Sequence, residues 1–124
     1  MSTVLIVEDN EKNMKLARDV LQAKGYRTLE AVTGEEGVKL AKQEIPDLVL
    51  MDIQLPGING IEAFRQIRAD GKTARIPVVA LTASVTPTDR STINAAGFDA
   101  FVSKPINLKE FLETVKRLVE RAGK

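Results

Sequence analysis

Short runs of apolar residues alternate with longer stretches of helical periodicity along the chain. Val4–Val7, residues 47–52 and residues 77–81 are apolar at nearly every position, which is typical of strands buried on both faces of a parallel sheet. Tyr26–Val32 alternates polar and apolar residues, and Asp99–Val102 is short, so these are predicted as more exposed strands.

A helical pattern follows each predicted strand. Thr33 with Glu36, and Asn107 with Glu110, have the spacing of helix N-terminal caps, and Gly25 supplies a stop after the first helix. Apolar residues recur at helical spacing within residues 16–21, 38–41, 61–67 and 108–119. The fourth helix, which ends near Gly97, is poorly apolar and is expected to be among the less stable elements.

Five strands that alternate with five helices predict an α/β fold, a doubly wound parallel sheet with right-handed crossovers and helices on both faces. The first, third and fourth strands are the most apolar and belong inside the sheet, while the second and fifth suit its edges. The order 2-1-3-4-5 satisfies this pattern. It places the reversal of strand direction, where such sheets bind ligands, between the ends of the first and third strands.

The composition narrows the possible functions. A chain of 124 residues with 44% hydrophobic residues fits one domain over residues 1–124. The net charge of +1 gives no strong field toward nucleic acid, and no apolar run approaches the roughly 20 residues that a membrane-spanning helix needs. Because the start has no basic leader, a cytoplasmic location is expected. Cysteine and histidine are absent, which excludes thiolate and imidazole chemistry from the chain itself.

Polar groups stand at the ends of four of the five predicted strands. They are Glu8 and Asp9, then Asp52, then Thr82 and Ser84, and finally Lys104. Two unit charges about 4 Å apart repel by about 4 kcal/mol at an effective dielectric constant near 20. Lys104 is one charge against three carboxylates, so a hard divalent cation is the natural complement, and Mg²⁺ suits oxygen ligands.

An aspartate beside a metal ion, an ammonium group and a hydroxyl has the parts needed to accept a phosphoryl group. Asp52 is predicted as the nucleophile and a metal ligand. Asp9 is predicted as a direct ligand, and Glu8 as a ligand through water or an orienting group. Lys104 would pair with the phosphoryl group, and Thr82 would donate a hydrogen bond to it.

Each of these residues also has a simpler explanation. The acidic pair with Asn10 can cap the first helix, Asp52 can cap its own loop, and Thr82 can close a strand. Lys104 can be a solvated residue at a turn before Pro105. Because all the groups arrive at the same edge of the sheet, the functional interpretation is favoured over four independent loop roles.

These residues resemble, over the whole chain, the receiver domains of two-component response regulators. In that family Glu8 and Asp9 correspond to the acidic pair, Asp52 to the phosphoacceptor and Thr82 to the switch residue. Lys104 is followed by Pro105, which matches the family's lysine and cis-proline. The resemblance implies a flavodoxin-like fold, a cis peptide bond before Pro105, and a Mg²⁺ cofactor that Mn²⁺ can replace.

The resemblance implies two further roles. Phe101 corresponds to the family's switch aromatic, although an ordinary strand residue would look the same. The backbone carbonyl of Gln54 corresponds to a metal ligand. The segments of residues 8–10, 13–16 and 51–56 are similar to those of a stand-alone cell-cycle regulator and of receivers in hybrid histidine kinases.

The resemblance therefore implies a stand-alone response regulator. It would take a phosphoryl group from a histidine kinase or a histidine phosphotransfer protein, and would catalyse only its own phosphorylation and slow dephosphorylation. The last predicted helix is followed only by Gly123 and Lys124, so no output domain is expected. A downstream protein is expected to bind the surface of the fourth helix, fifth strand and fifth helix, with no nucleic acid partner.

Three alternatives stay open at this point. Phosphatases of the haloacid dehalogenase type carry a second aspartate two residues after the nucleophile, where this chain has Gln54. A nucleotide-binding or flavodoxin-type module is disfavoured because the first turn, residues 8–12, is acidic and lacks glycine. The third alternative is a receiver cut from a hybrid kinase, against which Met1 and the short tail favour a complete protein.

Overall fold

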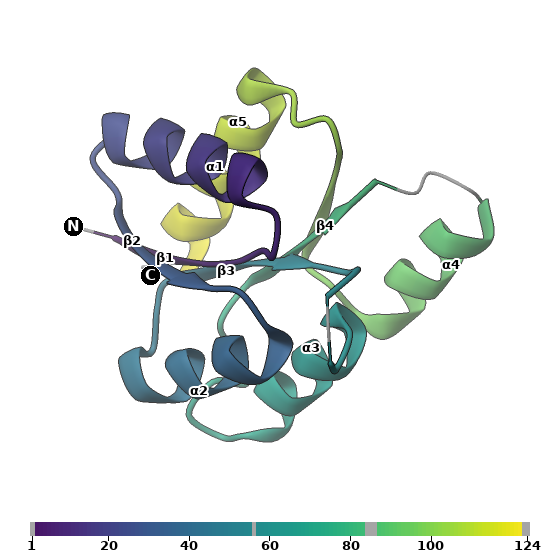
Figure 1. The fold of residues 1–124 in the computed structure, drawn as a ribbon. Coiled ribbons are helices and arrows are strands. Elements are labelled where there is room, and N and C mark those ends of the chain that lie inside the picture. The colour runs from purple at the N-terminus through teal and green to yellow at the C-terminus, as the bar shows by residue number, and fades with distance from the viewer. Residues whose placement is uncertain (1, 56, 84–86, 123–124) are drawn as a thin grey trace.

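The computed structural model describes residues 2–55, 57–83 and 87–122, so Ser84 of the predicted strand ends lies outside the described residues. Strands and helices alternate along the whole chain (Figure 1). Their bounds are β1 Thr3–Val7, α1 Glu11–Ala23, β2 Arg27–Ala31, α2 Gly34–Glu44, β3 Leu48–Asp52, α3 Gly60–Ala69, β4 Val78–Thr82, α4 Pro87–Ala96, β5 Ala100–Ser103 and α5 Leu108–Ala122.

The five strands form one parallel sheet in the order β2-β1-β3-β4-β5, which confirms the predicted fold class and strand order. The central strands β3 and β4 are buried at every position, whereas the edge strands β2 and β5 are partly exposed. Among the described residues, no helix is both long enough and apolar enough to cross a membrane.

Alternate residues of the inner strands divide the core into two clusters. Val4 and Ile6 of β1 face one side of the sheet and pack with α1 and α5, while Leu5 and Val7 face the other side and pack with α2 and α3. Figure 1 shows α1 and α5 over one face, with α2 and α3 over the opposite face. This arrangement buries the strands and leaves the loops after them to carry polar chemistry.

Polar side chains begin the helices close to the positions that the sequence predicts. Thr33 accepts a hydrogen bond from the backbone N–H of Glu36 at 3.1 Å, and Asn107 accepts one from Glu110 at 3.1 Å. Asn10 caps α1 in the same way. Since Asn10 lies shortly after β1, its cap fixes the direction in which the chain leaves the strand, and with it the place of the preceding carboxylates.

A cation–π and ion-pair cluster ties α3 to the beginnings of β4 and β5. The guanidinium group of Arg68 donates to Asp99 at 2.6 Å and lies 4.8 Å from the ring centroid of Phe64. The ring of Phe64 stacks on Phe98, with 4.2 Å between the centroids. Asp99 also accepts the backbone N–H of Val78 at 2.8 Å, so one carboxylate joins a helix to two strands.

The C-cap of α2 is a residue in a strained conformation. Ile45 has φ 45° and ψ 65°, which is the left-handed region, and 45% of its surface is exposed. A β-branched side chain is unfavourable there because its Cβ crowds the backbone. Ile45 therefore contributes strain without the compensation of full burial.

Replacing Ile45 by asparagine, which tolerates this region, is expected to raise stability by about 1 kcal/mol, or Tm by about 4 °C. Thermal and urea unfolding followed by circular dichroism measure the effect. Val32→Asn is the matched control, because Val32 is 52% exposed and is not among the residues with positive φ. Equal changes in Tm for the two variants would mean that the Ile45 backbone carries no relievable strain.

Candidate functional site

Neighbouring strands deliver four ionisable or hydroxyl side chains to the same edge of the sheet. Glu8 follows β1, Asp52 ends β3, Thr82 ends β4 and Lys104 follows β5. The first three are almost fully buried, with exposed fractions of 1% for Glu8, 4% for Asp52 and 2% for Thr82. Burial of two carboxylates is costly unless they are paired, so their partners decide what the site can do.

Lys104 is the cation that these carboxylates share. Its ammonium nitrogen Nζ lies 2.5 Å from Oε1 of Glu8 and 3.0 Å from Oδ2 of Asp52. Backbone donors bind the other oxygens, since the N–H of Asn10 lies 3.2 Å from Oε2 of Glu8 and the N–H of Gln54 lies 3.0 Å from Oδ1 of Asp52. The two carboxylates are thereby held in fixed orientations.

The charges at this edge do not balance. Burial raises the pKa of Glu8 to about 7, and neighbouring Asp52 adds to this effect against the opposing influence of Lys104. Burial works to lower the pKa of Lys104, but its hydrogen bonds to Glu8 and Asp52 outweigh burial and raise the pKa. The lysine stays charged, and the carboxylates still carry more negative charge than one ammonium group neutralises.

The donor set fits a hard divalent cation. One carboxylate oxygen from each of Glu8, Asp9 and Asp52 lies within 4.8 Å of the other two. Ligand oxygens around Mg²⁺ lie about 3 to 4 Å apart, because each Mg–O distance is about 2.1 Å. These three residues therefore come together as the sequence predicts, with Asp9 on the exposed side of the cluster. Gln54 lies two positions after Asp52, in the loop that follows β3.

The remaining predicted residues lie around this cluster. Thr82 is paired with Ser103 in the β4–β5 register, and its carbonyl accepts the backbone N–H of Lys104 at 2.8 Å. Phe101 is half-buried on β5, opposite Ala80. The peptide bond between Lys104 and Pro105 is cis.

Two of the simpler explanations hold beside the functional one. Asn10 is the N-cap of α1, so the acidic pair does precede a capped helix. Asp52 accepts the N–H of the residue two positions later, which is the pattern of an Asx turn. In both places the turn orients the carboxylates, so the local and functional roles support each other.

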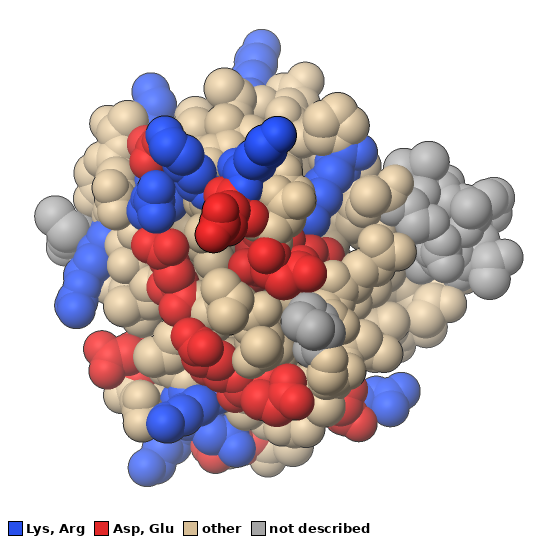
Figure 2. Space-filling model, viewed as in Figure 1, with Lys and Arg blue, Asp and Glu red and all other residues tan. Residues whose placement is uncertain are grey.

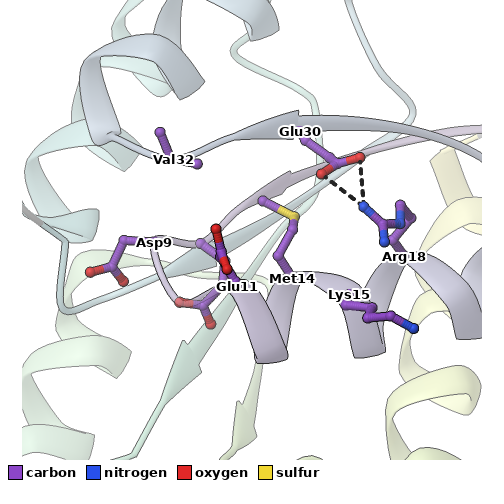
Figure 3. Close-up of a pocket in the computed structure, with 8 residues that line it drawn as sticks. Asp9, Glu11, Met14, Lys15, Arg18, Glu30 and Val32 are labelled. Carbon is purple, nitrogen blue, oxygen red and sulfur yellow. Dashed lines mark hydrogen bonds and ion pairs between the residues drawn. The ribbon is translucent and has the colours of Figure 1, made fainter.

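A hollow of about 370 Å³ extends from the acidic cluster along α1 toward β2. Figure 3 shows Asp9 and Val32 at one end and Arg18 of α1 beside Glu30 of β2 at the other, where the two side chains lie 3.3 Å apart. Figure 2 shows that Asp and Glu side chains gather across the middle of this face of the molecule. The site is thus open to a partner that brings positive charge or a metal ion.

The sequence reasoning missed Gly60, the first residue of α3. A Cβ built on Gly60 would overlap the backbone oxygen of Asp52, so no side chain fits unless the loop moves. Its N–H also donates to the carbonyl of Ile53 at 3.0 Å. A glycine at the start of a helix carries no such signal in the sequence, because the close approach exists only between folded segments.

A parallel sheet in this order, with a carboxylate cluster and a lysine at its carboxyl edge, defines a signalling domain of the CheY type. The chain belongs to the response regulator receiver domain family, whose description it matches over residues 4–116. It is therefore a protein of two-component signalling, as the resemblance implied.

Particular relatives share most of the chain. The polar-differentiation response regulator DivK of Brucella ovis is 46% identical over 114 residues, which cover 92% of this chain and 93% of DivK. Among solved structures, the receiver domain of the Pseudomonas aeruginosa sensor histidine kinase PA1611, with a magnesium ion coordinated in the active site cleft, is 33% identical with a TM-score of 0.90. The match covers 96% of this chain and 98% of that one.

The chemotaxis protein CheY4 of Vibrio cholerae is a further structural relative. It is 26% identical, has a TM-score of 0.88, and the match covers 95% of this chain and 98% of CheY4. Of these three relatives, DivK has the highest sequence identity to this chain, and the two solved structures share its CheY-like fold.

Adding one methyl group at Gly60 tests how closely α3 is tied to the site. Gly60→Ala is expected to lower the free energy of unfolding by about 2 kcal/mol, because the new Cβ collides with the backbone of Asp52. It should also weaken Mg²⁺ binding, because the loop that holds the carboxylate must shift. Urea unfolding and a Mg²⁺ titration followed by NMR measure the two effects.

Gly71→Ala is the matched control for this substitution. Nothing lies within 4 Å of a Cβ built on Gly71, and its backbone is outside the positive-φ region. The control is expected to match or slightly exceed the parent protein in stability. If Gly60→Ala unfolds and binds Mg²⁺ as this control does, the packing of α3 against Asp52 is not a constraint on the site.

Proposed function

We propose that this protein is a DivK-type response regulator that accepts a phosphoryl group on Asp52 and signals through contacts with other proteins. The observation that carries the proposal is the position of Asp52, buried beside Lys104 within a cluster of three carboxylates. The donor would be a sensor histidine kinase or a histidine phosphotransfer protein. The protein would act as an enzyme only on itself, by taking up the phosphoryl group and slowly hydrolysing the phosphoaspartate.

The chemistry follows from the contacts of Asp52. One carboxylate oxygen attacks phosphorus and forms an O–P bond, while the bond from phosphorus to the donor nitrogen or oxygen breaks and the leaving group keeps the electron pair. Lys104, which already lies 3.0 Å from Asp52, would stabilise the phosphoryl oxygens as a point charge. The Thr82 hydroxyl would donate a hydrogen bond to one of these oxygens.

The carboxylates of Glu8, Asp9 and Asp52, with the backbone carbonyl of Gln54, would hold Mg²⁺, and Mn²⁺ is expected to substitute. A bound divalent ion would supply positive charge that offsets the repulsion between the carboxylates and the incoming phosphoryl group. Asp9 would be a direct ligand, whereas the buried and hydrogen-bonded Glu8 is suited to an orienting role or to contact through water.

A phosphoryl group at Asp52 adds a charge of about −1.5 to −2 that must be read at the protein surface. Thr82 and Phe101 would transmit it, since they lie on the adjacent strands β4 and β5. The surface of α4, β5 and α5 would then bind the downstream protein. One hydrogen bond to a charged group contributes about 1.5 to 3 kcal/mol, less than the roughly 5.5 kcal/mol that a complete switch needs, so Lys104 and repacking of Phe101 must contribute.

A second candidate is a receiver that forms part of a hybrid histidine kinase. The 33% identity to the receiver domain of the sensor kinase PA1611 supports it. The 46% identity to DivK, with 93% of that regulator covered, favours the stand-alone type. The balanced charge and the protein partners expected of either type give no role to nucleic acid.

Asp52→Asn is expected to abolish phosphorylation, because the amide is not a nucleophile toward phosphorus. The protein is incubated with labelled acetyl phosphate or a phosphorylated histidine phosphotransfer protein, with Mg²⁺ or with excess chelator. Asp19→Asn is the control, since that carboxylate is exposed and distant in sequence from Asp52. Undiminished labelling of the Asp52 variant, or labelling of the parent in chelator, would contradict the assignment.

Beryllofluoride, which stands in for the phosphoryl group on Asp52, tests the path to the surface. Amide NMR shifts are expected to extend from Asp9 and Asp52 to Phe101 and into α5. In Thr82→Val, which keeps the shape but removes the hydroxyl, the changes at Phe101 should shrink while those near Asp52 persist. Changes confined to the loops around Asp9 and Asp52 in the parent protein would mean that partners read the site directly.

A further inference from the structure

A groove of about 580 Å³ lies at the opposite edge of the sheet from Asp52. Ser2, which precedes β1, and Tyr26, which precedes β2, mark this edge, and one side of α5 completes the groove. Figure 1 shows that α1 and α5 cover the same face of the sheet. The volume falls within the range of roughly 300 to 1,000 Å³ that is typical of small-molecule sites.

The floor of the groove is apolar and firmly supported. Tyr26 and Leu112 are partly buried and pack against the core cluster on this face, and Val119 is 8% exposed. Burial raises the pKa of Tyr26, and the charge of Glu120 adds to this effect. The phenol therefore stays protonated near neutral pH and keeps a hydrogen to donate at the edge of an apolar surface.

The rim of the groove carries positive charge. Lys24, Lys109 and Lys116 line it and are exposed, and none of them takes part in the ion pairs found among the described residues. Lys109 and Lys116 are seven residues apart on α5, about 10 Å along the helix. The carboxylates of Glu113 and Glu120 also line the groove, so the excess is a single positive charge.

We propose that this groove, between Tyr26, Leu112 and the three lysines, binds a small molecule with an aromatic or aliphatic body and one acidic group. The body would lie on Tyr26 and Leu112, and the acidic group would accept hydrogen bonds from a lysine ammonium group. A second acidic group is disfavoured because it meets Glu113 or Glu120. The site lies outside the phosphoacceptor chemistry and does not depend on the proposed function.

The probe for this site is 2-naphthalenesulfonate, titrated into ¹⁵N-labelled protein and followed by amide NMR. Saturable shifts are expected at Tyr26, Leu112 and Lys116, with 2-naphthol and inorganic sulfate each binding about tenfold more weakly, because each keeps only the body or only the charge. The double variant Lys109→Gln/Lys116→Gln is expected to bind the probe about tenfold more weakly than the parent. Lys39→Gln, on α2, is the matched control and should bind as the parent does.

Three results would overturn the proposal. One is the absence of saturable shifts in the groove, and another is equal affinity of the double lysine variant and the parent protein. The third is a response of the groove to protein concentration instead of the probe, measured by sedimentation, which would make the groove an interface between copies of this chain. Labelling of Asp52 is measured in the same variants and should be unchanged, which separates this test from that of the phosphoacceptor.

Discussion

The hydrogen bonding of one lysine to two buried carboxylates is the interaction on which this structure depends. Glu8 and Asp52 come from different strands, and Lys104 comes from a third, so the contacts at 2.5 and 3.0 Å join the ends of β1, β3 and β5 at one point. Without the ammonium group, two almost fully buried carboxylates would face each other where water solvates them poorly. The site is therefore also a structural junction of the sheet.

The rest of the fold serves to hold that junction in place. The strands divide the core into two clusters, which positions their ends relative to one another. Gly60 allows α3 to begin directly against the backbone of Asp52, and Arg68, further along the same helix, is bound to Asp99 before β5. One helix thus connects the loop of the phosphoacceptor with the strand that precedes Lys104.

Much of this arrangement is predictable from the sequence, for a physical reason. Burial on both faces makes the inner strands continuously apolar, so their ends, their order and the meeting of Glu8, Asp52 and Lys104 follow from local patterns. Contacts that depend on the distance between packed segments leave no such pattern. The approach of Gly60 to Asp52, the pairing of Arg68 with Asp99 and the groove beside Tyr26 belong to this second class.

The backbone hydrogen bond from Lys104 to the carbonyl of Thr82 has a mechanical consequence. Thr82 and the residue before Lys104 occupy the last rung of the β4–β5 ladder, so the backbones that carry the hydroxyl and the ammonium group form one rigid frame. A displacement of either strand end moves both backbones together. Hinge-like motion at this corner of the sheet is therefore a single mechanical coordinate, where two unconnected strand ends would offer two.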